Sequence, residues 1–291
     1  MRQNLSKEIS IFAPAKINLY LHITGKRDDG FHLLDSLVAF ADYGDQISVK
    51  PAEHLTLTIK GPFSNGLSTG GDNLVLKAAY LLADFIGLKA KADITLSKNL
   101  PVASGIGGGS ADAAATLLAL AELWGISPSL QDLMGLAENL GSDVPVCLTG
   151  TPSFISGIGE KIAPAPALPD TWLVLVNPNT PVSTPEVFAQ RKGDFSSPQP
   201  FNKKVKSAIE FANLLAGYQN SLTSAAIFNA AVIQDVLTVL EEVPGQLLTR
   251  LSGSGATCFS IFATKDEADS AAISLQMKYP HWWIKSVTLG S

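Results

Sequence analysis

The chain has 291 residues, of which 46% are hydrophobic and 16% charged, so it can bury a sizeable core and by length suggests two domains. Its net charge of −5, without any block of like charge, argues against a broad surface for nucleic acid or an anionic membrane. No apolar stretch reaches membrane-spanning length, and the four histidines show no metal-ligand spacing. Cys147 and Cys258 lie far apart in apolar runs and are interpreted as buried thiols. The first ten residues contain no hydrophobic signal core, which predicts a cytoplasmic protein.

The alternation of apolar and polar residues over Ile17–Ile23 predicts a half-buried strand, and Gly25–Gly30 is expected to be a charged turn after it. Asp72 is expected to cap a helix that runs from Asn73 to about Ile86. The other strands expected in this part of the chain lie at residues 33–41, 46–50, 55–60 and 92–97.

In the second half of the chain, one helix is expected to end near Trp124, and Ser127 to cap the next, with Pro128 at its first position. Residues 161–170, rich in proline and alanine, are the best candidate for a crossing between domains. The expected strands lie at 146–149, 153–156, 173–176, 257–262 and 283–289, the helices at about 203–216, 223–242 and 265–279, and the loops at 191–202 and 253–255. The final strand, helix and strand suggest a small α+β sandwich.

Four glycines fall within Gly105–Gly109, and a strongly helical run begins directly after them. Glycine allows a positive φ and lets a ligand approach without meeting a Cβ, while the first turn of a helix leaves N–H groups unpaired at the positive end of its dipole. The combination predicts a cradle for phosphate. The run lacks the Lys-Ser/Thr pair of a P-loop, and Ser110 occupies the third glycine position of the Rossmann pattern. The alternative is a flexible turn, which would leave the entropic cost of four glycines without a ligand to offset it.

Three stretches of the chain resemble the motifs of the GHMP kinases, which include galactokinase, homoserine kinase and mevalonate kinase. They are Pro14–Leu21, Pro101–Ala114 and Arg250–Thr257, and they occur in the family's order over most of the chain. The resemblance implies an α+β fold with two domains. Residues 1–162 would form the N-terminal domain with the glycine-rich phosphate loop, and residues 163–291 the C-terminal α+β sandwich.

Within this family, the stretches Pro14–Leu19, Gly25–His32 and Leu140–Pro145 are similar to the kinases that phosphorylate the 2-hydroxyl of 4-diphosphocytidyl-2-C-methyl-D-erythritol in the non-mevalonate route to isoprenoid precursors. The resemblance implies ATP and Mg²⁺ as cofactors, with no residue identified as a metal ligand. It also implies a small-molecule substrate, no nucleic-acid or membrane partner, and a monomer or weak homodimer.

Two other functions stay open from the sequence. One is another small-molecule kinase of the family, such as a mevalonate or homoserine kinase, although these lack the stretch Gly25–His32 in this form. The other is a non-catalytic nucleotide-binding protein on the same fold, against which the presence of both Lys16 and Asp143 argues.

Lys16 and Asp143 are the candidate catalytic residues. Asp143 follows a helix end and precedes Val-Pro, where a carboxylate can project from a rigid corner, although an Asx turn accounts for it equally well. Lys16 lies on a predicted strand, where a solvated lysine is the ordinary interpretation. The resemblance implies that Asp143 is the base and that Lys16 lies beside it, where its charge keeps the carboxylate ionised.

The resemblance also implies five substrate-binding residues. Phe31 and Phe188 would stack on the two faces of cytosine, and His32 would contact the edge of the base; both phenylalanines fit a core role as well, and a histidine after a turn is usually just exposed. Asn18 and Thr184 would supply polar contacts to the substrate.

For the nucleotide, the resemblance implies contacts from Asn73 near adenine and from Lys98 to phosphate or purine, and the motif itself supplies Pro101, Gly105, Gly107, Gly108, Gly109 and Ser110. Asn73 is equally expected as part of a helix cap, and Lys98 as a surface lysine at a strand end. The chain departs from the family pattern at Ala103-Ser104, where Gly-Gly is frequent, and at Asn220–Thr223, where two acids are missing.

Overall fold

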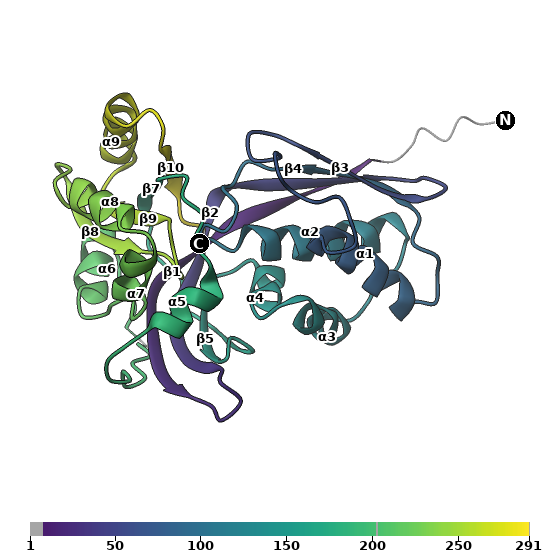
Figure 1. The fold of residues 1–291 in the computed structure, drawn as a ribbon, viewed down its shortest axis with the longest axis horizontal. Coiled ribbons are helices and arrows are strands. Elements are labelled where there is room, and N and C mark those ends of the chain that lie inside the picture. The colour runs from purple at the N-terminus through teal and green to yellow at the C-terminus, as the bar shows by residue number, and fades with distance from the viewer. Residues whose placement is uncertain (1–7, 202, 291) are drawn as a thin grey trace. The chain divides into compact units, whose positions relative to one another are not determined.

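The computed structural model describes residues 8–201 and 203–290, which form two units that each combine a sheet with helices (Figure 1). The first unit contains the chain up to Ala15, Gly44–Val102 and Gly107–Thr149. The second contains Lys16–Tyr43, Ala103–Ile106 and the chain from Gly150 onward. The chain therefore passes between the units several times, and the predicted boundary between residues 162 and 163 stays a prediction about the family's domains.

Residues 1–7 of the polar N-terminal segment, and Asn202 at the end of the predicted loop 191–202, lie outside the described residues. Among the helices that the structure does describe, none has both the length and the apolar character needed to cross a membrane.

The sheet of the first unit is built from β3 (Leu55–Lys60), β4 (Ala92–Ser97) and the end of β2 (His32–Lys50). β3 runs parallel to β4, and β4 runs antiparallel to residues 46–50 of β2. In β4 the alternate residues Ala92, Ile94 and Leu96 are buried, which is the period-two pattern expected of a strand with one face on the core.

The helices of the first unit are α1 (Leu74–Phe85), α2 (Gly108–Leu123), α3 (Leu130–Leu140) and α4 (Val144–Thr149). α1 packs against α2 and α3, and α4 also packs against α2 and α3. Figure 1 shows these helices together on one side of the sheet. α2 is buried almost all round, because its run of alanines lets neighbouring helices approach closely.

β1 (Ile9–Lys26) and β2 pair with each other, and both are much longer than the sequence pattern predicts. The predicted break between residues 41 and 46 is wrong, since β2 continues through Gly44. A Cβ at Gly44 would lie 2.2 Å from the carbonyl oxygen of Ala13 on β1. The glycine is therefore required by the close approach of two backbones, and it does not end the strand.

The second unit contains two sheet regions. In one, β5 (Ser153–Gly157) runs antiparallel to residues 34–38 of β2, and β6 (Lys161–Pro164) pairs with β5. In the other, an antiparallel sheet has the order β10-β7-β9-β8, built from β7 (Trp172–Asn177), β8 (Gln246–Leu251), β9 (Cys258–Phe262) and β10 (Trp283–Thr288). The sequence pattern missed β8 and also β6, which occupies part of the segment predicted as a crossing between domains.

The helices of the second unit are α5 (Thr184–Gln190), α6 (Ala208–Leu215), α7 (Thr223–Asn229), α8 (Val232–Glu241) and α9 (Lys265–Lys278). α8 packs on β8 and β9, and α9 packs on β10 and β7. The predicted helix 223–242 is in fact two helices, because Ala230 has an extended backbone. α5 was not predicted.

Two helix caps and one element differ from the predictions. Asn73, and not Asp72, caps α1, since its side chain accepts a hydrogen bond from the N–H of Val75. α3 begins later than predicted, with Ser129 and Asp132 forming a capping box. Residues 146–149 belong to helix α4 and not to a strand.

Candidate active site

The glycine loop enters α2 through left-handed backbone. Gly105 has φ +75° and Gly107 has φ +65°, values that strongly favour glycine. Gly107 is the N-cap of α2, and no side chain caps this helix end. Because the first N–H groups of a helix have no intrahelical carbonyl partner, the first turn of α2 presents donors that suit an anion. Ala103 also has a positive φ, of 50°, which explains why glycine is frequent at this position in the family's motif.

A second glycine-rich loop, Gly253–Gly255, lies against the first loop within the second unit. A Cβ at Gly105 would lie 2.4 Å from the carbonyl oxygen of Ser252. The hydroxyl of Ser252 donates to the carbonyl of Gly105 over 3.0 Å, and the N–H of Thr257 donates to the carbonyl of Ser104, also over 3.0 Å. The backbone of the glycine loop is thus held by hydrogen bonds from a distant part of the chain.

Asn220 supports this second loop. Its side-chain amide donates to the carbonyls of Leu251 (2.9 Å) and Gly253 (2.8 Å), while its oxygen accepts from the N–H of Leu222. The segment that departs from the family pattern therefore keeps a buried residue whose amide holds the glycine turn in place.

Lys16 and Asn18 are alternate residues of β1 and so face the same side of the strand. The Lys16 side chain is buried, and its backbone N–H donates to the carbonyl of Ile106 in the glycine loop over 2.9 Å. The amide nitrogen of Asn18 donates to the hydroxyl of Ser36, but its buried Oδ1 has no partner among the described residues. An orphaned buried acceptor is costly, so Oδ1 is suited to a donor on a ligand.

Asp143 lies in the turn between α3 and α4, as the sequence indicates, and is partly exposed. Its backbone carbonyl accepts the N–H of Cys147, which fixes the backbone of Asp143 at the start of α4. Because Asp143 belongs to the first unit and Lys16 to the second, the pairing of the two stays a prediction.

The structure brings together part of the predicted cytosine site. The rings of His32 and Phe188 lie 5.3 Å apart between centroids, and the hydroxyl of Thr184 is 2.7 Å from that of Ser254 in the second glycine loop. Phe31 has 59% of its surface exposed, which is a high fraction for an aromatic side chain that only fills a core. Burial lowers the pKa of His32, and the positive charges of Lys26 and Arg191 add to the effect. The imidazole is therefore neutral at pH 7 and able to accept a hydrogen bond as well as donate one.

Lys98 is buried and bound to two carboxylates of its own unit. Its Nζ lies 2.5 Å from Oδ2 of Asp45 and 2.6 Å from Oδ2 of Asp112, and each of the three side chains is at least nine-tenths buried. Burial alone would lower the pKa of Lys98, but the two carboxylates outweigh it and raise the pKa. Burial raises the pKa of Asp112 to about 7, which Lys98 opposes and Asp45 reinforces. Contact of Lys98 with ATP stays a prediction, whereas its contacts with the carboxylates are direct.

Asn73 uses both ends of its side-chain amide within the protein. Its Oδ1 accepts from Val75, and its Nδ2 donates to the carbonyl of Ser68 over 2.7 Å. The capping role is thus established, and a contact to adenine stays a prediction.

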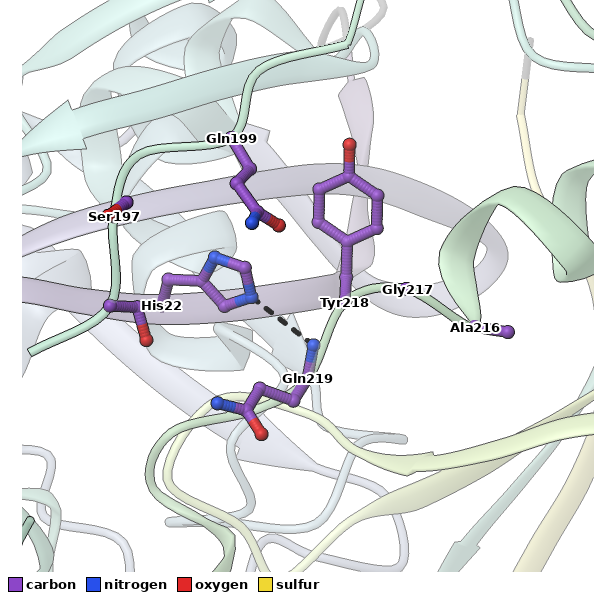
Figure 2. A pocket seen from close by; sticks show the side chains of 8 residues that line it. His22, Ser197, Gln199, Ala216, Gly217, Tyr218 and Gln219 are labelled. Atoms are coloured by element: carbon purple, nitrogen blue, oxygen red, sulfur yellow. Dashed lines mark hydrogen bonds between the residues drawn. The ribbon is translucent and has the colours of Figure 1, made fainter. Parts of the chain in front are cut away.

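A separate polar cavity of about 420 Å³ lies in the second unit, and the buried side chain of His22 is part of its lining (Figure 2). Nε2 of His22 accepts the N–H of Gln219 over 3.2 Å, so the proton of the neutral ring is on Nδ1. Nδ1 lies 3.9 Å from Oδ2 of Asp35 and has no hydrogen-bond partner among the described residues. Burial lowers the pKa of His22 despite the attraction of Asp35, with a smaller lowering effect of Arg250. The cavity is lined by none of the predicted site residues, and Figure 2 shows neutral side chains around the ring.

Two residues of the site escaped the sequence analysis. Ser252 belongs to the C-terminal motif, and its position directly before Gly253-Ser254-Gly255 was the available signal. Asp45 gave no signal, because it lies in the predicted break between two strands, where a single aspartate most often only faces solvent. Among the described residues, no group of three or more metal-ligating side chains is suited to hold a metal ion.

Comparison with known proteins agrees with this geometry. Residues 73–151 match the family model described as GHMP kinases N terminal domain, and residues 203–281 match GHMP kinases C terminal. A crystal structure of homoserine kinase from Cytophaga hutchinsonii superposes with a TM-score of 0.72 at 18% identity, over 99% of this chain and 97% of that one, and so shares the fold. The chain is a GHMP kinase, and the predicted α+β fold of that class is confirmed.

Proteins with a higher sequence identity to this chain identify its family within the GHMP kinases. A protein from Paramagnetospirillum magneticum named 4-diphosphocytidyl-2-C-methyl-D-erythritol kinase is 50% identical over 96% of this chain and 98% of its own length. A relative of the same name from Rhodospirillum rubrum is 47% identical over 93% and 89%. A crystal structure of 4-(cytidine 5'-diphospho)-2C-methyl-D-erythritol kinase has a TM-score of 0.80 at 32% identity, covering 97% of this chain and all of that one. The chain belongs to the family of the 4-diphosphocytidyl-2-C-methyl-D-erythritol kinases.

Proposed function

We propose that the protein transfers the γ-phosphoryl group of ATP to the 2-hydroxyl of 4-diphosphocytidyl-2-C-methyl-D-erythritol. The observation that carries this proposal is the left-handed turn at Gly105 and Gly107, which leads into the uncapped N-terminus of α2 and suits the phosphates of a nucleotide. The names of relatives that are up to 50% identical over nearly the full length support the choice of substrate.

Phosphoryl transfer depends mainly on positioning and on neutralising charge. In the proposed mechanism, the N–H groups of Gly108, Gly109 and Ser110 bind the phosphates, and Asp143 accepts the proton of the attacking hydroxyl. The ammonium of Lys16 stabilises the ionised carboxylate and the charge that develops on the acceptor oxygen. Gly105 and Gly107 would bring the loop backbone close to the phosphates, and Pro101, which has no N–H to donate, would shape the start of the loop.

Mg²⁺ is the metal expected with ATP, and when bound it neutralises charge on the phosphate oxygens. Magnesium usually takes only one or two carboxylates together with phosphates and waters. The described residues include no group of three or more metal-ligating side chains that would identify its ligands, so no step of the proposal uses the metal.

For the substrate, the orphaned Oδ1 of Asn18 would accept a hydroxyl of the methylerythritol part, next to Lys16 on the same side of β1. His32 and Phe188, whose rings lie 5.3 Å apart, would contact the edge and one face of cytosine, and the exposed ring of Phe31 would cover the other face. Thr184 would contribute a hydroxyl beside the second glycine loop.

A coupled assay of ADP release tests the proposal directly. ATP with 4-diphosphocytidyl-2-C-methyl-D-erythritol should give rapid turnover, and ATP with mevalonate or homoserine should give none above the background. The reverse preference would assign the chain to another kinase of the class. Asp143→Asn should lower kcat by about two to four orders of magnitude, since it removes the general base, while the affinity for ADP stays near normal. Retained activity in this variant would exclude Asp143 as the base.

A further inference from the structure

A buried cluster of three charged side chains, Asp45, Lys98 and Asp112, lies at the base of the glycine loop. They come from β2, from the residue that follows β4, and from the second turn of α2, all within the first unit. The Lys98 ammonium contacts both carboxylates at 2.5 and 2.6 Å, and Asp45 is fully buried.

Asp45 also binds the segment that enters the loop. Its Oδ1 accepts the backbone N–H groups of Asn99 (2.5 Å) and Leu100 (2.9 Å), and the Asn99 side chain donates to the carbonyl of Gly44 over 3.1 Å. One carboxylate thus fixes the two residues directly before Pro101, where the loop begins.

Asp112 connects the same cluster to the segment that leaves the loop. It is the fifth residue of α2, which begins at Gly108. A Cβ at Gly108 would lie 3.1 Å from Nζ of Lys98 and 3.5 Å from Oδ2 of Asp45, so the first residue of the helix lies directly over the ammonium. The ammonium therefore joins the entry and the exit of the phosphate loop.

Stability alone does not account for this arrangement. Replacing a buried ion pair by well-packed apolar side chains is often neutral or stabilising, because burial removes the hydration of each charge. The cluster places two buried carboxyl groups around a single ammonium. Oδ1 of Asp112 also lacks a partner among the described residues. A geometric function explains a cluster that electrostatics alone would not favour.

We propose that Asp45, Lys98 and Asp112 form a clamp that fixes the two ends of the glycine loop relative to each other, so that the first N–H groups of α2 are pre-positioned for the phosphates of ATP. The proposal rests on the proposed function, because it assumes that ATP binds at this loop. It assigns Lys98 a positioning role in place of the predicted direct contact with ATP, and it adds Asp45 and Asp112 as positioning residues.

The two roles for Lys98 predict opposite results for Asp45→Asn. If Lys98 binds ATP directly, loss of Asp45 releases the ammonium and leaves the KM for ATP unchanged or lower. If the cluster is a clamp, Asp45→Asn and Lys98→Met each raise the KM for ATP by about tenfold to a hundredfold, because a misplacement of about 1 Å costs this much in a positioned site. The double variant should then be no worse than the more affected single variant, since both act on one unit.

Asp112 provides a matched pair of variants. Asp112→Asn keeps an oxygen that can accept from Lys98, whereas Asp112→Leu keeps a similar volume and removes the acceptor. The clamp predicts a KM for ATP within about threefold of wild type for Asn and about tenfold or more above it for Leu. The KM for the cytidylyl substrate should change little in either variant. Equal effects of Asn and Leu on the KM for ATP would overturn the clamp.

Binding of a fluorescent ADP analogue to the full-length protein, measured beside the kinetics, separates the possible failures. If wild type binds the analogue but does not phosphorylate the cytidylyl compound, the proposed function fails and the clamp is still tested by analogue affinity. If wild type is active and Asp45→Asn binds the analogue as tightly as wild type, the clamp alone is wrong. If Lys98→Met does not fold, the comparison of Asp112→Asn with Asp112→Leu still tests the clamp.

Discussion

Gly105→Ala is the substitution whose effect on stability can be worked out most directly. The backbone of Gly105 has φ +75°, and an L residue in left-handed backbone costs about 1–2 kcal/mol. The added Cβ would also meet the carbonyl oxygen of Ser252 at 2.4 Å and the nitrogen of Gly255 at 2.7 Å. Both are backbone atoms, so the second loop must move, and overpacking of this kind costs about 1–3 kcal/mol. The total is about 2–5 kcal/mol, a large part of a typical stability of about 5–15 kcal/mol.

Gly193→Ala is the matched control in the same unit. Gly193 also has a positive φ, of 94°, but no heavy atom lies within 4 Å of the position that its Cβ would take. The Gly193→Ala variant should lose only about 1–2 kcal/mol of unfolding free energy, which is the cost of placing an L residue in left-handed backbone. Urea unfolding followed by circular dichroism gives both values, and the KM for ATP should rise in Gly105→Ala alone. Equal unfolding free energies for the two variants would refute the close contact between the loops.

Two further predictions concern the buried polar groups of the second unit. Tyr20→Phe removes a hydroxyl that donates to Oδ1 of Asp35 over 3.1 Å, and it should lower the unfolding free energy by about 1–3 kcal/mol; a loss below about 0.5 kcal/mol would show that this bond contributes little. His22→Gln tests the buried imidazole. Because burial lowers the pKa of His22 in the folded protein below its ordinary 6.5, the unfolded chain binds the proton more tightly. The stability that the neutral imidazole contributes is therefore present above pH 6.5 and is lost as the pH falls through the pKa of His22 in the folded protein. The stability of wild type relative to the variant, from urea midpoints at several pH values, should therefore decrease on the acid side, and parallel curves would contradict it.

Local sequence patterns predicted those elements whose backbone conformation depends on the residue types within the segment itself. The glycines of the loop were expected to allow positive φ; Gly105 and Gly107 have it, whereas Gly108 and Gly109 are already helical. The alternation over Ile17–Ile23 predicted a strand that forms part of β1. Predictions of this kind succeed because the signal depends on the residue's own conformational freedom and on burial of one face.

Predictions failed where contacts between distant parts of the chain determine the local backbone conformation. Val146–Thr149 begins and ends with β-branched residues that favour a strand, yet it is part of α4, a short helix that packing against α2 and α3 stabilises. Gly44 lies in the predicted break between two strands, whereas in the structure the strand continues and the approach of Ala13 from β1 requires the glycine. The cap of α1 moved by one residue, from Asp72 to Asn73, because both side chains can accept backbone hydrogen bonds.

The same distinction applies to the candidate site. The residues that would contact ATP were recognisable in the sequence, because four closely spaced glycines cost backbone entropy that a bound phosphate offsets. The residues that hold this run in shape were not, because Asp45 and Ser252 act through hydrogen bonds to segments 54 and 147 positions away in the chain.

A binding site made of backbone N–H groups has no side chain of its own to substitute. Its geometry depends on the groups that hold the backbone, which here are the Ser252 hydroxyl on Gly105 and the Lys98 ammonium beneath Gly108. Substitutions at such positions should therefore weaken nucleotide binding more than substitutions of exposed residues such as Ala103 or Val102 beside the loop. Under the proposed function, phosphate affinity depends on buried polar residues that do not touch the phosphate. A search for determinants of ATP binding should therefore include residues buried around the loop as well as those that line it.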